Sequence, residues 1–207
     1  MKLKDLWALA FIPFVLGCGS TVNMGPGPDL GGSKYTKVES GTLQQSGKTL
    51  SGTGRIVFND PLTEVGSNKN FDLSFSLEDG SSFTLITHST NKLEQGVEVR
   101  FSRQGTSLKV TFRVQGSEND VSDAFLDVVA SGPLRFFVDA HNSESPAHFL
   151  IWKGDATSFD EENALLNSES DGMAVPGNGS GNFWGMSLEN ATLIEAAVGD
   201  AKFVEAE

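Results

Sequence analysis

Apolar side chains recur at every second position over long stretches of this chain. They alternate with polar side chains at residues 71–78 (FDLSFSLE), and the same period of two returns at residues 97–102 and 108–114. Such alternation places apolar side chains on one face of a β-strand and polar side chains on the other. No helical pattern of comparable length competes with it, so the sequence predicts an all-β fold in which many strands bury one face.

Further strands are predicted where short β-branched or aromatic runs lie between turn residues. The predicted strands are 54–59, 71–77, 82–88, 97–101, 108–114, 124–129, 134–141, 147–153, 183–188 and 192–198. Asp79-Gly80 is expected to make a tight hairpin turn, because Asp-Gly favours such turns. With at most one short helix, at Asp160–Leu166 in a loop, these segments predict an antiparallel β-sandwich of two packed sheets with about 10 to 12 strands.

The N-terminal residues carry an export signal rather than a strand pattern. Lys2 and Lys4 precede an apolar run at Leu6–Leu16, which is shorter than the roughly 20 residues that a membrane-spanning helix needs. The run ends in Val15-Leu16-Gly17-Cys18, which resembles the lipobox of bacterial lipoproteins. The resemblance implies cleavage before Cys18 and attachment of diacylglycerol to its sulfur. The alternative is a secreted protein in which this cysteine is incidental.

These features divide the chain into three parts. Residues 1–17 are expected to be a cleaved signal peptide, residues 18–34 the lipidated cysteine with a Gly/Pro-rich tether, and residues 35–207 the β-sandwich domain. Since Cys18 is the only cysteine, no disulfide or thiolate metal site is expected elsewhere. The expected location is the cell envelope, with the chain anchored to a membrane by its lipid. In a diderm bacterium, Gly19 favours the outer over the inner membrane by the same resemblance.

Two predicted strands, 134–141 and 147–153, carry bulky side chains on both faces. If one set fills the core, the other lies on an outer face of the sandwich. Two interpretations follow: the loop at 154–182 covers this face, or the face is a platform on which a sugar ring stacks. The candidate ligand-binding residues are Trp152, Phe137, Leu150 and His148.

The order of the strand sequences resembles the concanavalin A-like lectin/glucanase jelly roll, in its laminin G-like and legume-lectin-like branches. The resemblance spans residues 38–203 and is carried by FDLSFSLEDGSSFTLITHS, GVEVRFSRQGTSLKVTF, LRFFVDAHN, HFLIW and GNFWGMSLENATLIEAAVG. It implies two curved antiparallel sheets packed back to back. It also implies that glycans or proteins bind on the concave face or the rim, without fixing which.

Legume-type lectins hold calcium in a loop that follows a strand, and VDAHN at residues 138–142 offers oxygen ligands at a similar place. The candidate ligands are Asp139, Asn142, His141 and Glu144. The second loop aspartate of that family is absent here, so the alternative is a polar hairpin end. His141 and His148 could instead meet across the hairpin and bind a transition metal, although a third ligand is not evident.

Catalysis is not expected. The enzymes of this fold place paired carboxylates on one strand, and the nearest run here, Glu118–Asp123, ends in Asp and lies between predicted strands. Nucleic-acid binding is not expected either, because the chain carries a net charge of -12 and has no clustered basic segment. The basic residues Arg100, Lys109 and Arg113 are expected to pair with Glu98, Asp72 and Glu78.

Two functions remain, with a third behind them. The first is a membrane-anchored envelope lipoprotein whose lectin-like domain binds a carbohydrate. The second is a structural or assembly lipoprotein that binds another envelope protein. A glycoside hydrolase of the same fold is the third.

Overall fold

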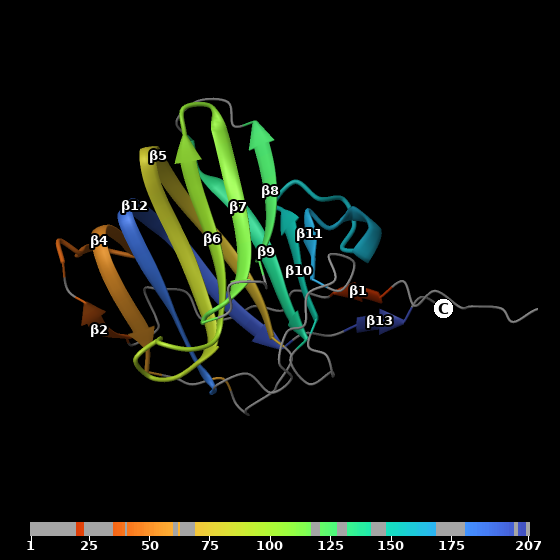
Figure 1. The fold of residues 1–207 in the computed structure, drawn as a ribbon, viewed down its shortest axis with the longest axis horizontal. Coiled ribbons are helices and arrows are strands. Elements are labelled where there is room, and N and C mark those ends of the chain that lie inside the picture. The colour runs from red at the N-terminus through yellow and green to blue at the C-terminus, as the bar shows by residue number, and fades with distance from the viewer. Residues whose placement is uncertain are drawn as a thin grey trace, which may run out of the picture.

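The computed structural model describes residues 20–22, 35–39, 41–59, 62, 69–116, 121–127, 132–141, 148–168, 181–200 and 203–205. Their strands are β1 (Ser20–Val22), β2 (Tyr35–Glu39), β3 (Gln44–Ser46), β4 (Thr49–Phe58), β5 (Lys69–Ser89), β6 (Val97–Gln104), β7 (Ser107–Val114), β8 (Val121–Asp127), β9 (Leu134–His141), β10 (His148–Lys153), β11 (Leu166–Asn167), β12 (Phe183–Asp200) and β13 (Phe203–Glu205). A 3₁₀ helix, η1 (Glu161–Asn163), is the one helical element among these residues. The expected all-β fold is confirmed (Figure 1).

Two long strands, β5 and β12, hold the fold together. They pair with each other along their whole length, antiparallel, from Phe183↔Ser89 to Asp200↔Lys69. The first half of β5 also pairs with β9, whereas its second half pairs with β6. One hydrogen-bonded sheet therefore divides into two branches at β5.

The two branches face each other as the layers of a sandwich. One runs through β5, β9, β10 and β11, and the other through β5, β6, β7 and β8, with every pairing antiparallel. In Figure 1 the strands β6 to β8 lie in front of β9 and β10. β4 and β2 extend the sheet beyond β12, and β1 pairs with β13 in a separate two-stranded sheet.

Aromatic side chains fill the space between the layers. The ring of Phe101 on β6 lies 4.5 Å from that of Phe136 on β9, and Phe112 on β7 lies 5.3 Å from Phe149 on β10. These rings belong to one cluster of buried apolar residues that draws on both layers. The alternating pattern thus buries one face of each strand, as the sequence predicts.

The hairpin expected at Asp79-Gly80 is wrong. β5 continues through these residues, and its two halves both pair with β12 rather than with each other. Residues 78–81 bulge out between Leu77, opposite Ala191, and Ser82, opposite Glu189. Gly80 has the positive φ that favours Asp-Gly in turns, but here it serves a bulge at the point where the sheet divides. Residues 183–188 and 192–198, predicted as two strands, are likewise one strand, β12, with irregularities.

No helix among the described residues is long and apolar enough to cross a membrane. The apolar run at residues 6–16 and the cysteine at position 18 lie outside the described part of the chain. The short helix expected in a loop at Asp160–Leu166 is represented by η1, which begins after Asp160.

Candidate functional site

The expected exposed platform around Trp152 is wrong, because these side chains form a second buried cluster. Trp152 is 0% exposed, Leu150 1% and Phe137 7%. Phe159 covers them: its ring is perpendicular to that of Trp152, at 5.6 Å, and to that of Phe137, at 5.0 Å. Of the two interpretations of this face, the covering loop is the one that the structure shows.

Hydrogen bonds fasten the covering segment, residues 154–165, to the sheet. The indole Nε1 of Trp152 donates to the backbone oxygen of Asp160, at 3.0 Å. The backbone nitrogen of Leu165 donates to the oxygen of Ile151, at 2.7 Å, so the segment re-enters the sheet as it reaches β11. The indole of Trp152 is therefore covered by the ring of Phe159, and its N–H group is hydrogen-bonded. A sugar ring has no access to it.

Two of the four predicted calcium ligands, Asp139 and His141, belong to the described residues. Asp139 lies on β9, fully buried, opposite Asn70 of β5 and Leu150 of β10. Asn142 and Glu144 lie outside the described residues. Among the residues that are described, no three His, Cys, Asp or Glu side chains come together as metal ligands.

The two histidines considered for a transition metal are His141 at the end of β9 and His148 at the start of β10. They lie directly opposite each other in the register of these strands. Metal binding at this end of the hairpin, by calcium or by a transition metal, stays a prediction.

A different outer surface gathers polar side chains together with an exposed aromatic ring. It is the outward side of β12, β5, β6, β7 and β8, here called the polar face. Three rows cross it in register. The first row is Glu189, Ser82, Ser102, Lys109 and Phe125; the second is Ser187, Thr84, Arg100, Thr111 and Asp123; the third is Gly185, Ile86, Glu98, Arg113 and Val121.

At the β12 side of the polar face, three side chains form a closed network. A guanidinium nitrogen of Arg100 donates to Glu189 Oε2 at 2.8 Å and to Ser82 Oγ at 3.1 Å. Ser82 Oγ in turn donates to Glu189 Oε2 at 2.7 Å. The long side chain of Arg100 is thereby held in one orientation, although it is about half exposed.

At the β8 side, Phe125 stands out into solvent with 67% of its surface exposed. Lys109, its partner on β7, places Nζ 5.7 Å from the ring centroid and 2.8 Å from a carboxylate oxygen of Asp123. Thr111 donates to the other oxygen of Asp123 at 2.7 Å. Partial burial raises the pKa of the Asp123 carboxyl, but the hydrogen bonds from Lys109 and Thr111 outweigh it and hold that pKa below its ordinary value.

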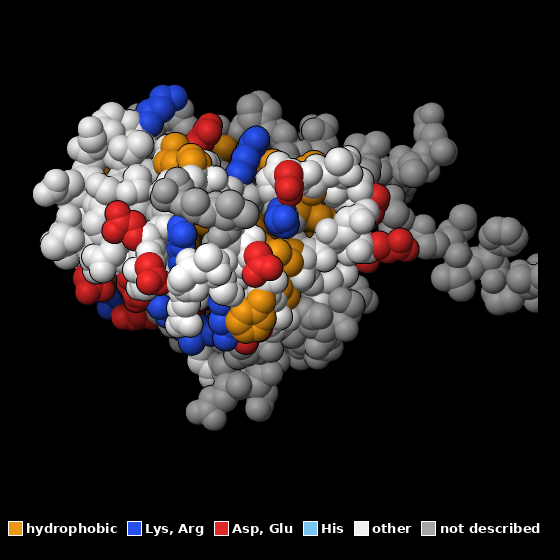
Figure 2. Space-filling model, turned by 90° about the horizontal axis from the view of Figure 1, so that it is seen from above, with side chains coloured by type: hydrophobic (Ala, Val, Ile, Leu, Met, Phe, Trp, Pro, Cys, Tyr) orange, Lys and Arg blue, Asp and Glu red, His pale blue; other side chains and the backbone are white. Residues whose placement is uncertain are grey.

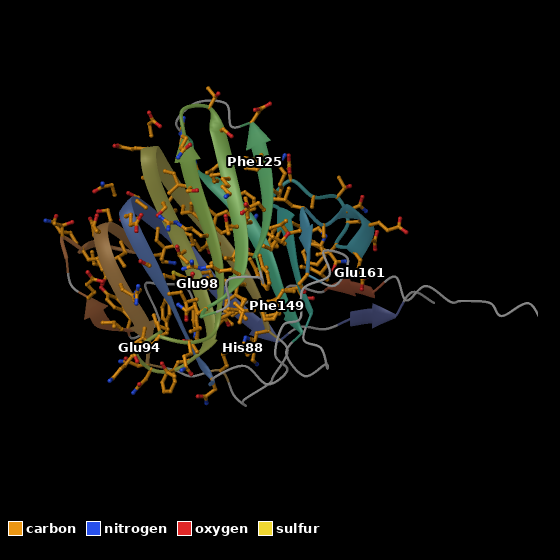
Figure 3. The ribbon with its side chains drawn as sticks, viewed as in Figure 1. His88, Glu94, Glu98, Phe125, Phe149 and Glu161 are labelled. Carbon is orange, nitrogen blue, oxygen red and sulfur yellow. The ribbon has the colours of Figure 1, made fainter. Side chains whose placement is uncertain are left out.

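The third row forms the end of the polar face that lies farthest from the β6–β7 turn. Glu98 is buried and accepts hydrogen bonds at 2.5 Å from both Arg113 and Gln115. Beyond it, Ile86 and Leu93 belong to a small apolar cluster where the segment after β5 folds over the sheet. Figure 3 shows Phe125 nearer the β6–β7 turn and Glu98 nearer the opposite end of these strands.

A hollow of about 330 Å³ lies over the middle of this surface, between β12 and β7. Its floor is made by side chains of the first two rows, and the β6–β7 turn forms its upper border. Seen from above, toward the end of the molecule that carries the β6–β7 turn, charged side chains of both signs lie beside small patches of hydrophobic side chains (Figure 2). Four basic side chains line the hollow together with serine and threonine hydroxyl groups and the carboxylate of Glu189, so it offers both hydrogen-bond donors and acceptors.

The sequence pointed to part of this surface without identifying it as a site. The pairing of Arg113 with Glu98 is confirmed, whereas Arg100 pairs with Glu189 and Lys109 with Asp123. The signal for Phe125 is present in β8: it alternates with Ala124 and Leu126, which pack on the core, and shares the other face with two aspartates. A large ring on an acidic face of a strand is a sign of exposure.

The carboxylate run considered for catalysis is described only in part. Glu118, Asn119 and Asp120 lie outside the described residues, and Asp123 lies on β8. A general acid of a glycosidase needs a raised pKa, and the pKa of Asp123 is lowered. The lowered pKa favours the ionised carboxylate of Asp123, which accepts hydrogen bonds.

No family model matches this sequence, and no curated protein matches it. Solved structures do share the fold. A legume lectin-like domain from Entamoeba histolytica matches with a TM-score of 0.53 and 6% identity, over 81% of this chain and 90% of that one. The carbohydrate-binding module CBM66 from Bacillus subtilis matches with a TM-score of 0.47 and 15% identity, over 81% and 92%.

A prokaryotic β-1,3-1,4-glucanase (lichenase) derived from a mouse hindgut metagenome matches with a TM-score of 0.49 and 6% identity, over 83% of this chain and 93% of that one. The likeness to the legume lectin-like domain, together with the two facing branches of antiparallel strands, confirms the expected jelly-roll β-sandwich. At such identities the likeness extends to the fold alone.

Proposed function

We propose that this protein binds a carbohydrate on the polar face and that a lipid on Cys18 anchors it in the cell envelope. The observation that carries the first part is the exposed ring of Phe125 beside an ordered set of donors and acceptors. A sugar presents an apolar ring face and a rim of hydroxyl groups, so an aromatic ring and charged hydrogen-bond partners match both of its surfaces.

The fold supports this proposal at a coarser level. The legume lectin-like neighbour has a name that denotes sugar binding, and its sandwich has the same architecture. The polar face is broad enough for such a ligand: five strands about 4.8 Å apart extend over roughly 19 Å. The anchoring part of the proposal rests on the sequence at residues 15–18.

The direct experiment is a binding screen of the purified full-length protein, in mild detergent, against immobilised polysaccharides. Phe125→Ala should lower affinity by about 0.5 to 1.5 kcal/mol, the range for loss of an aromatic stacking partner. Val38→Ala is the matched control, because Val38 is also exposed and lies on β2, at the opposite edge of the sheet. Equal affinities of the two variants, or no binding to any polysaccharide, would contradict the proposal.

A further inference from the structure

The charged side chains in the three rows of the polar face cancel one another. Three basic groups project from β6 and β7, and each lies against its own carboxylate. Arg100 pairs with Glu189 at 2.8 Å, Lys109 with Asp123 at 2.8 Å, and Arg113 with Glu98 at 2.5 Å. The three pairs have a formal net charge of zero.

A fourth basic residue, Arg103, borders the same hollow and is held by the backbone. Its guanidinium donates to the oxygens of Leu77, at 2.9 Å, and Gly105, at 3.0 Å. The carboxylate of Asp79 lies at the same turn, where it accepts from the backbone nitrogen of Gly105 at 2.7 Å. One positive and one negative group thus meet at the β6–β7 turn, beside the hollow.

This balance of positive and negative side chains disfavours the binding of charged ligands. An anionic group that approached Arg100 or Lys109 would meet the carboxylate of Glu189 or Asp123 in the same place, and like charges at such distances repel. A hydroxyl group has no such conflict, because it can donate to the carboxylate and accept from the neighbouring cation at once. The net charge of the whole chain, -12, adds a weak repulsion of polyanions.

The extent of the face also indicates the size of the ligand. Phe125 and Glu189 lie at opposite ends of the first row, with three strands between them. Four strand spacings of about 4.8 Å separate Phe125 from Glu189, at the far side of the Arg100 network, by roughly 19 Å. One sugar ring cannot reach both ends, whereas a chain of several sugars can.

We propose that the ligand of the polar face is an uncharged glycan chain of several sugar residues. This inference rests on the proposed function and narrows its ligand class. It assigns Phe125 and Lys109 to one end of the chain and Arg100, Ser82 and Glu189 to the other.

The test compares defined probes on the full-length protein in mild detergent. The neutral probes are laminarin, xyloglucan and galactomannan, and the acidic probes are alginate, polygalacturonate and chondroitin sulfate. We expect at least one neutral probe to bind, with an affinity that changes by less than about twofold between 50 and 500 mM NaCl, because no net charge is neutralised. Acidic probes should bind at least about tenfold more weakly, as like-charge contacts oppose them. Monosaccharides should bind more weakly than oligosaccharides of the same sugar.

A variant that removes one carboxylate tests the same preference for neutral over acidic probes. Asp123→Asn leaves Lys109 without its carboxylate, so binding of acidic probes should rise by about three- to tenfold, with a gain that high salt removes. Glu162→Gln, which removes one exposed negative charge from the covering segment on the opposite face, is the matched control and should leave the preference unchanged.

The two proposals fail in different ways. If an acidic probe binds the unmodified protein most tightly, weakens strongly with salt and still depends on Phe125, the neutral-ligand inference is overturned and carbohydrate binding stands. If no probe binds, or binding ignores Phe125→Ala, the proposed function itself is overturned, and this inference with it.

Discussion

The ring of Phe159 stands perpendicular to the indole of Trp152, at an interplanar angle of 87° and a centroid distance of 5.6 Å. This edge-to-face contact joins the covering segment to β10 and turns an outer sheet face into a second small core. Among the described residues, the sandwich therefore has one outer face that is covered, over β9 and β10, and one on which Phe125 is exposed, over β6 to β8. The proposed ligand site lies on the second of these faces.

Removing the buried indole should destabilise the fold. Trp152→Ala should lower the free energy of unfolding by about 3 to 5 kcal/mol, because it leaves a cavity in the second cluster and removes the ring contact with Phe159. Urea denaturation followed by circular dichroism measures this. Phe125→Ala, at an exposed ring, should change stability by no more than about 0.5 kcal/mol. A stable Trp152→Ala variant that had lost glycan binding would contradict the covered cluster.

Backbone conformation makes one glycine much less replaceable than another. Gly96 has a φ of +139°, and a Cβ there would lie 2.6 Å from the backbone oxygen of Thr87. Gly80 has a φ of +76° with nothing within 4 Å of its Cβ position. Gly96→Ala should therefore cost more than about 3 kcal/mol, from strain and overlap together, and Gly80→Ala about 1 to 2 kcal/mol from strain alone. Thermal melts of the two variants test this order, and equal losses would refute it.

The carboxyl group of Asp123 should make a small contribution to acid sensitivity. Its pKa is lower in the folded chain than its ordinary value of 3.8, so the ionised form stabilises the fold above that pH. This stabilisation is lost as the pH falls through the lower, folded-state pKa. The advantage of the native chain over Asp123→Asn should be below about 1 kcal/mol at pH 6, because the pair is solvent-screened, and should disappear once the pH is below the folded-state pKa. An advantage that grew on acidification would have the wrong sign.

Lipid attachment is tested separately from the domain. Cells that produce the protein should incorporate a radiolabelled or clickable fatty acid into it, and Cys18→Ala should abolish the label and shift the chain out of the membrane fraction. The rest of the chain has no other cysteine that could carry a thioether. Membrane association that persisted without label would contradict lipid anchoring.

The strands were predictable from sequence because the main core takes every second residue of each. β9, at Leu134–His141, has the predicted bounds, and the alternation there matches the observed split between Val138 in the main core and Phe137 in the second one. The alternation does not indicate which distant segments pair with each other. The hairpin at Asp79-Gly80 failed for this reason: the turn dipeptide is local, whereas the partner of both halves of β5 is β12, about a hundred residues later.

The candidate site was less predictable than the fold. Trp152 has the sequence features of a sugar platform, and only the position of Phe159 in the covering segment removes it from solvent. The residues next to Phe125 in the sequence indicate an exposed ring but not a binding site. Only the strand register places Phe125 beside Lys109 and in line with Glu189. Whether an aromatic ring is covered depends on tertiary packing, which a single strand pattern does not encode.

Hydrogen–deuterium exchange of the full-length protein, with and without the best-binding glycan of the screen, tests the central claim most directly. The polar-face account predicts slower exchange in peptides that cover β6, β7 and β8, and unchanged exchange in the segment at residues 154–165. Protection confined to that segment, or to the ends of β9 and β10 where His141 and His148 lie, would contradict it and would move the ligand to the other side of the sandwich.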